Sequence, residues 1–101
     1  MAHAQETKEI RQKIKIKKVL IGKAEHYYVK AQVGLFVIEN HELKVGDKII
    51  ISGPTTGNQE VILDKMLVNG IESSTAKTGD KVTFMVPFRV RLSDKLFKII
   101  E

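Results

Sequence analysis

The chain has 101 residues, a formal net charge of +5 and no cysteine. This length supports one domain with a modest core, and the absence of cysteine excludes disulfides and thiolate metal sites. No segment reaches the roughly 18 consecutive apolar residues of a membrane-spanning helix, and the N-terminus is polar where a signal peptide is apolar. We therefore expect a cytoplasmic protein that does not bind membranes.

The positive charge is concentrated at the N-terminus. Residues 1–23 carry seven basic and two acidic side chains, a balance of +5, whereas residues 24–101 carry ten of each. A basic segment attracts an anionic partner such as RNA or DNA, but it also serves simply to keep a protein soluble. The sequence leaves both interpretations open.

The first structured element is predicted to begin at residue 13. Residues 1–12 show no apolar periodicity and are expected to form a flexible basic arm, while residues 13–101 form the folded domain. From residue 13 isoleucine and lysine alternate, as in a strand with one buried face. The alternation slips at Lys17-Lys18, which predicts a β-bulge that bends the strand, and Gly22 sharpens the bend.

Further strands follow at short intervals, and no long helical pattern separates them. Glycine, proline and asparagine delimit the segments, as they do in turns. We expect these strands over residues 33–39, 48–52, 59–68 (with a slip at Asp64-Lys65), 82–86 and 95–100. Such spacing predicts an all-β fold, namely a single small six-stranded β-barrel that is closed or nearly closed.

Three strands begin after corners of similar sequence. These corners are Gly46-Asp47, Gly79-Asp80 and Ser93-Asp94. Glycine adopts the positive φ that a tight corner needs, and aspartate accepts hydrogen bonds from nearby backbone groups. We interpret the aspartates as structural. Because the three histidines are also far apart in sequence, we expect no metal site, no acid–base pair, no cofactor and no enzymatic activity.

The candidate binding surface is the lysine-covered first strand together with the aromatic residues that follow it. An aromatic ring can stack on an unpaired base, a contact worth about 1 to 3 kcal/mol, and paired arginines can clamp phosphate or carboxylate. The alternative is that the tyrosines pack in and over the barrel while the arginines lie on a solvated face. The candidate RNA- or partner-binding residues are Lys13, Lys15, Lys17, Lys18, Lys23, His26, Tyr27, Tyr28, Arg89 and Arg91.

The order of these motifs resembles two known domain types. The series formed by Gly22, residues 43–49 and residues 78–82 resembles the β-barrel second domain of translational GTPases such as elongation factor Tu, and small stand-alone elongation factor-like barrels. Residues 52–66, followed later by Val86-Pro87, are also similar to the C-terminal barrel of the collagenase-like peptidase family, whose members are linked to RNA hydroxylation.

These resemblances imply two functions. The first implies a non-catalytic module that binds RNA, the ribosome or a translation-related protein. The second implies an accessory barrel that completes a collagenase-like peptidase or an RNA-modifying enzyme in trans. The chain has no Gly-x-x-x-x-Gly-Lys-[Ser/Thr] phosphate loop, so no nucleotide cofactor is expected.

Overall fold

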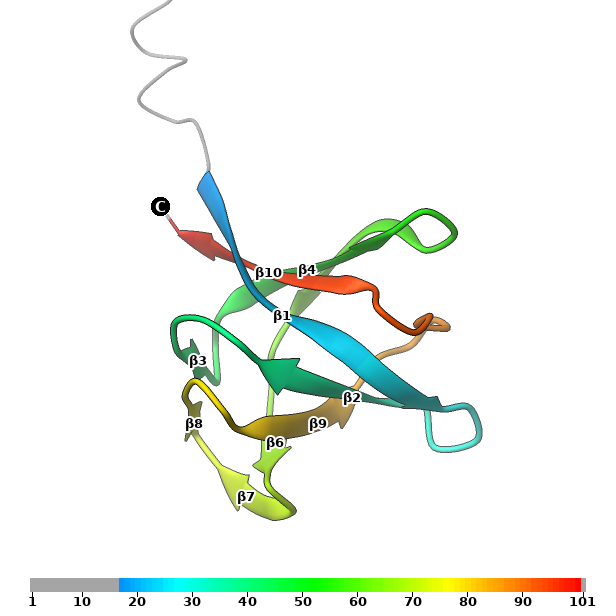
Figure 1. Cartoon of the computed structure of the whole chain (residues 1–101). Coiled ribbons are helices and arrows are strands. Elements are labelled where there is room, and N and C mark those ends of the chain that lie inside the picture. Colours follow the sequence, from blue (N-terminus) through cyan, green and yellow to red (C-terminus); the bar gives the residue numbers. More distant parts are fainter. Residues whose placement is uncertain (1–16, 101) are drawn as a thin grey trace, which may run out of the picture.

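A computed structural model describes residues 17–100, which form ten β-strands and no helix (Figure 1). The strands are β1 (Lys17–Tyr28), β2 (Val33–Ile38), β3 (Leu43–Lys44), β4 (Lys48–Gly53), β5 (Gly57–Ile62), β6 (Met66–Val68), β7 (Ile71–Ser73), β8 (Thr75–Ala76), β9 (Lys81–Met85) and β10 (Lys95–Ile100). The all-β prediction is confirmed. The expectation of six strands is wrong, because the predicted strand over residues 59–68 divides in two and short strands form in segments predicted to be connections.

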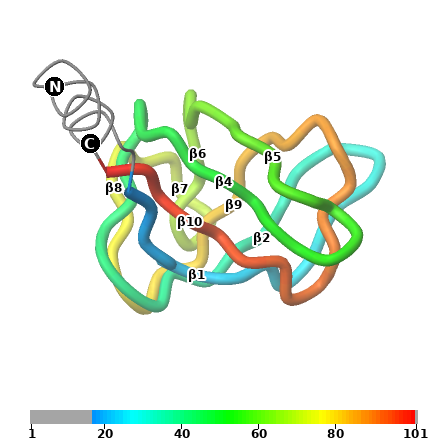
Figure 2. The backbone as a smooth tube through the Cα atoms, turned by 90° about the horizontal axis from the view of Figure 1, so that it is seen from above, coloured from blue at the N-terminus to red at the C-terminus, as the bar shows by residue number. Residues whose placement is uncertain are grey.

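Eight strands form one antiparallel sheet in the order β5-β4-β10-β1-β2-β9-β6-β7, and β3 pairs separately with β8. Seen from above, the strands wind around a common interior (Figure 2). β5 and β6 are consecutive, joined by residues 63–65, and pair with β4 and β9 respectively. Within residues 17–100 no backbone ladder joins β5 to β9 or to β7, so the barrel that was predicted to be closed or nearly closed is not closed by backbone pairing.

The long strand β1 is bent, but not where the sequence pattern indicates. Lys17 and Lys18 pair regularly with β10, and the register shifts between Leu20 and Gly22. The reason is packing at Gly22, which lies against the carbonyl group of Val37 on β2. A residue without a side chain is required at this approach, and the bulge forms there.

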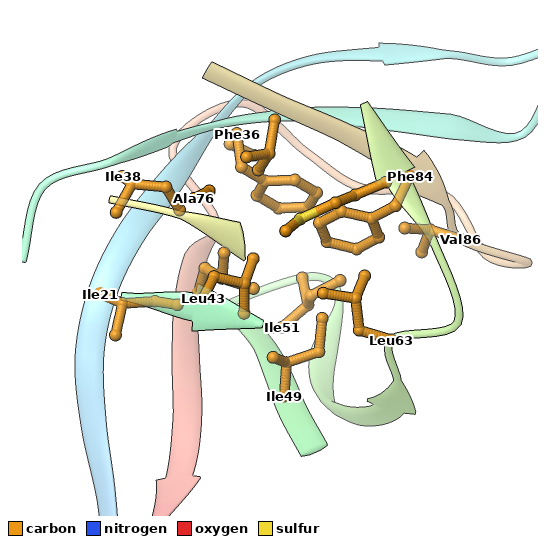
Figure 3. Close-up of a cluster of buried hydrophobic side chains, with 14 of the residues drawn as sticks. Ile21, Phe36, Ile38, Leu43, Ile49, Ile51, Leu63, Ala76, Phe84 and Val86 are labelled. Atoms are coloured by element: carbon orange, nitrogen blue, oxygen red, sulfur yellow. The ribbon is translucent and has the colours of Figure 1, made fainter. Parts of the chain in front are cut away.

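The core is built from the inward faces of the strands (Figure 3). On β2 burial alternates, so Gly34, Phe36 and Ile38 are buried and the residues between them are half-buried. The rings of Phe36 and Phe84 stack with centroids 4.9 Å apart. Such aromatic pairs contribute about 0.5 to 1.5 kcal/mol beyond the burial of their area.

The three corners share one geometry. In each, the aspartate Oδ2 accepts a hydrogen bond from the backbone N–H three residues earlier, at 2.8 Å for Asp47, 2.9 Å for Asp80 and 2.9 Å for Asp94. The residue before each aspartate has positive φ, 99° at Gly46 and 96° at Gly79. Local backbone bonding therefore accounts for these carboxylates.

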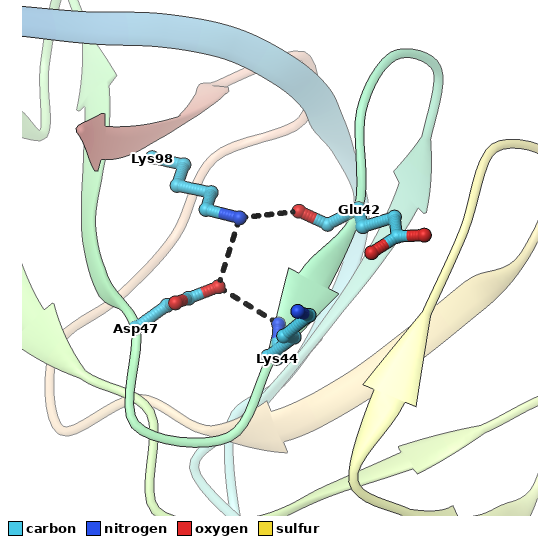
Figure 4. Close-up of polar contacts among 4 residues, drawn as sticks. All are labelled: Glu42, Lys44, Asp47 and Lys98. Carbon is cyan, nitrogen blue, oxygen red and sulfur yellow. Dashed lines mark hydrogen bonds and ion pairs between the residues drawn. The ribbon is translucent and has the colours of Figure 1, made fainter.

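At the first corner, Asp47 also contacts the last strand (Figure 4). The Nζ of Lys98 lies 3.3 Å from Asp47 Oδ2 and donates to the carbonyl of Glu42 at 3.0 Å. The two charged side chains are only 19% and 22% exposed. This contact ties the corner to β10.

At the second corner, two hydrogen bonds lower the pKa of Asp80 below its ordinary value. The larger effect comes from the backbone N–H of Lys77 and the smaller from the side chain of Asn69. A lowered folded-state pKa means that the ionised form is favoured on folding. The resulting stabilisation is present at neutral pH and is lost as the pH falls through the lowered pKa.

Replacing Gly46 with valine is expected to lower the free energy of unfolding by about 1 to 3 kcal/mol, because a β-branched residue is strongly disfavoured at positive φ. A Cβ at this position would meet no atom within 4 Å, so steric overlap does not contribute. Urea denaturation measures the change. An unfolding midpoint equal to that of the unmodified protein would contradict the assignment of this corner.

Candidate functional site

The candidate site does not lie at the three corner aspartates. The three notable aspartates serve their corners, and no group of three or more His, Cys, Asp or Glu side chains among residues 17–100 is placed to hold a metal ion. Every buried side-chain nitrogen or oxygen in this part of the chain has a hydrogen-bond partner. Two surfaces hollowed by cavities are the candidate binding sites of the described residues.

The larger candidate surface is an apolar groove where the sheet fails to close. It is a cavity of about 510 Å³ bordered by the end of β5, the connection at residues 63–65, β6 and the end of β9. Three of its large apolar side chains are exposed: Ile62 at 58%, Leu67 at 43% and Met85 at 67%. We name this surface the seam groove. Exposed apolar side chains gathered in one concave site are typical of interaction surfaces.

The smaller candidate surface is a cavity of about 400 Å³ lined by His26, Tyr27, Arg89 and Arg91, with Val90 and Leu92. We name it the basic pocket. The histidine and the arginines are far apart in the sequence. They meet because the backbone of Ala24 on β1 bonds to Asp94 and Ser93, at 2.8 and 3.0 Å.

The basic pocket presents two exposed arginines. Neither Arg89 nor Arg91 forms an ion pair with a carboxylate of residues 17–100. The structure also supports part of the alternative interpretation of the aromatic residues, since Tyr27 packs against the core and donates its hydroxyl to the Val86 carbonyl at 2.7 Å. Tyr28 lies outside the pocket, with its ring 4.4 Å from that of His26.

The lysines of the first strand do not line this pocket. Lys18 lies over the ring of Phe97, with 4.6 Å between Nζ and the centroid, and Lys23 forms an exposed ion pair with Glu39 at 3.9 Å. Lys17 is exposed at the start of β1. Lys13, Lys15 and the predicted arm over residues 1–12 lie outside the described residues. The structure thus brings four of the ten candidate residues together.

Sequence reasoning missed the seam groove. Its exposed residues occupy strand positions that alternation alone does not distinguish from core positions. The one usable signal is the slip at Asp64-Lys65, which marks the place where the predicted strand divides into β5 and β6.

The fold of residues 17–100 is shared with a domain of known structure. It is the fold of the C-terminal domain of a protein assigned to the U32 peptidases from Geobacillus thermoleovorans, with a TM-score of 0.73 over 78% of this chain and 90% of that chain, at 20% identity. The selenomethionine variant of that domain gives a TM-score of 0.69 over 79% of this chain and 98% of that chain, again at 20% identity. At this identity the likeness concerns the fold.

In sequence, the chain is similar to a collagenase of Porphyromonas gingivalis W83, with 39% identity over 84 residues, and to an uncharacterized protease of Methanocaldococcus jannaschii, with 33% identity over 87 residues. These matches cover 80% and 86% of this chain but only 20% and 21% of the two proteins. The chain therefore spans about a fifth of the length of the curated relatives that it matches. No family profile matches the chain.

The resemblance to elongation factors is wrong. The relatives are named as proteases, and the matching structures are a peptidase C-terminal domain. The Gly-Asp corners on which that resemblance depended start strands through local backbone bonding, so they specify turns and do not identify a family. The second resemblance, to collagenase-like peptidases, is the one that the comparisons support. They lend no support to a role in translation or RNA binding.

Proposed function

We propose that this chain is a non-catalytic docking domain that works with the remainder of a collagenase-like peptidase. The observation that carries the proposal is the sequence similarity, which extends over four-fifths of this chain but reaches only a fifth of the length of the collagenase. The remaining four-fifths of a collagenase of that length is large enough to form a protein surface on which this domain can dock. The proposal covers a partner in the same polypeptide and a partner on a separate one.

Two features of the described residues support a docking role. Their notable aspartates accept hydrogen bonds from the backbone of their own corners, so these carboxylates serve the fold. The seam groove supplies the exposed apolar surface through which such a domain can bind a protein. The domain alone is expected to show no proteolytic activity.

The test is binding to a collagenase-like peptidase from the same organism, expressed without its own copy of this domain. Unmodified protein is expected to form a stoichiometric complex in size-exclusion chromatography. Ile62→Lys is expected to weaken binding at least about tenfold, because a charge in a desolvated apolar contact is costly. Ile71→Lys is the matched control, because Ile71 is 73% exposed and lies outside the groove.

Two results would contradict the proposal. One is the absence of any complex with the unmodified domain. The other is loss of binding in both lysine variants to the same degree, which would point to a general effect of charge and not to the groove.

A further inference from the structure

The two edges of the eight-stranded sheet are unequal. One edge is β7, which has only three residues, and the other is β5, which has six. Proteins normally protect edge strands from pairing by making them short or by placing lysine or proline on them. The sequence of β5 is Gly-Asn-Gln-Glu-Val-Ile, without lysine or proline. This edge is long, and Glu60 is the one charged side chain on it.

The backbone groups on the free side of β5 can be identified from hydrogen bonds at its end. Leu63 donates its N–H to Asp47 O at 3.0 Å and accepts from the N–H of Gly46 at 2.7 Å, so its backbone faces the β4 side. In an antiparallel ladder the direction of the backbone groups alternates from residue to residue. Glu60 and Ile62 therefore direct their N–H and C=O groups to the free side, where no strand of residues 17–100 pairs with them.

The opposite border of the seam groove also presents backbone groups. The N–H of Val86 donates to the carbonyl of Gln32 at 2.8 Å, so the backbone groups of Val86 point toward β2. Because the direction alternates along a strand, the backbone groups of its neighbour Met85 point toward the groove. Thr83 pairs with Leu67 of β6, but the ladder between β6 and β9 stops before Met85. Backbone hydrogen-bonding groups thus line both borders of an apolar groove.

We propose that the seam groove binds an extended apolar segment of the peptidase partner, which adds to the free edge of β5 as a further strand. This inference rests on the proposed function and specifies its mode of binding. An extended segment satisfies the backbone groups of Glu60 and Ile62 and directs every second side chain into the groove, whereas a helix leaves those groups unpaired. A segment with apolar residues at alternate positions fits this arrangement.

A second copy of the chain fits less well. Pairing of two β5 edges about a two-fold axis satisfies the same backbone groups. It supplies polar side chains, however, because Asn58, Gln59 and Glu60 occupy most of the edge, and polar side chains match the exposed apolar Leu67 and Met85 poorly. The apolar lining beyond β5 therefore favours an apolar segment of the peptidase partner over the β5 strand of a second copy.

The test separates backbone pairing from side-chain contact at one position. Glu60→Pro removes the outward N–H without affecting the ladder to β4, and proline is tolerated on the free side of an edge strand. Glu60→Ala removes the same side chain but keeps the N–H. Both are compared by calorimetric titration with the peptidase lacking its own copy of the domain, after thermal unfolding has shown that each variant is folded.

We expect Glu60→Pro to bind at least about tenfold more weakly than Glu60→Ala, since it removes one main-chain hydrogen bond and places a ring where the added strand lies. Glu60→Ala is expected to bind within about twofold of the unmodified domain. Equal affinity of the two variants, with Ile62→Lys still impaired, overturns strand addition but leaves the proposed function intact. Failure of the unmodified domain to bind overturns both. Self-association of the unmodified domain that Glu60→Pro abolishes assigns the edge to a second copy and also overturns the inference.

Discussion

Replacing Asp94 with alanine is expected to lower the free energy of unfolding by about 3 kcal/mol. Asp94 is only 2% exposed, and its carboxylate accepts hydrogen bonds from the Arg91 N–H at 2.9 Å and from the hydroxyl of Thr56. Hydrogen bonds to charged groups contribute about 1.5 to 3 kcal/mol each, and their removal here leaves partly buried donors without a partner. Chemical denaturation measures the loss.

The matched control is Asp47→Ala, at the corner with the same local geometry but more contact with water. Its expected cost is smaller, about 1 to 2 kcal/mol, because water replaces the lost corner hydrogen bond and the partly exposed ion pair with Lys98 adds at most about 1 kcal/mol. The difference between the two variants arises from what Asp94 does beyond its corner, since it also holds the β4–β5 hairpin through Thr56. Equal costs for the two substitutions would contradict the contribution that we assign to the burial of Asp94 and to its hydrogen bond with Thr56.

Replacing Gly22 with alanine is expected to cost about 2 to 3 kcal/mol. A Cβ added at this position overlaps the backbone carbonyl oxygen of Val37 and lies 3.1 Å from the carbonyl carbon of the same residue. Unlike the tip of a flexible side chain, a paired backbone cannot move without disturbing the ladder between β1 and β2, so the cost falls in the range of overpacked cores. Thermal or urea unfolding gives the value.

Gly57→Asn provides the comparison, because Gly57 has a φ of 76° and a Cβ added there would meet no atom within 4 Å. Asparagine adopts this conformation readily, so we expect a change below about 1 kcal/mol. A Gly22→Ala variant as stable as Gly57→Asn would mean that β1 can bend elsewhere, as the pattern at Lys17-Lys18 indicated.

Local patterns predicted much of the strand structure. The two-residue alternation located the main strands, and the breaker residues located the turns between them, because both depend on neighbours in the chain. The corners at Gly46, Gly79 and Ser93 were predictable for the same reason, since their aspartates bond to backbone three residues away.

The candidate sites were predictable only in part. His26, Tyr27, Arg89 and Arg91 were selected for their chemistry, and the structure places them around one pocket. Of the lysines selected with them, three lie along β1 in the described part of the chain, where Lys18 contacts Phe97 and Lys23 contacts Glu39. Residue type indicates what a side chain can bind, whereas convergence depends on which segments the fold brings together.

The sequence by itself therefore determined the all-β character, the approximate positions of the main strands and the corners, which arise from interactions between residues close in the chain. Only the tertiary structure decided that the chain bends at residues 63–65, so that β5 pairs with β4 and β6 pairs with β9. That bend leaves the edge of β5 without a partner among the described strands and opens the seam groove. Whether an edge finds a partner depends on how the whole sheet winds, and no local pattern contains that information.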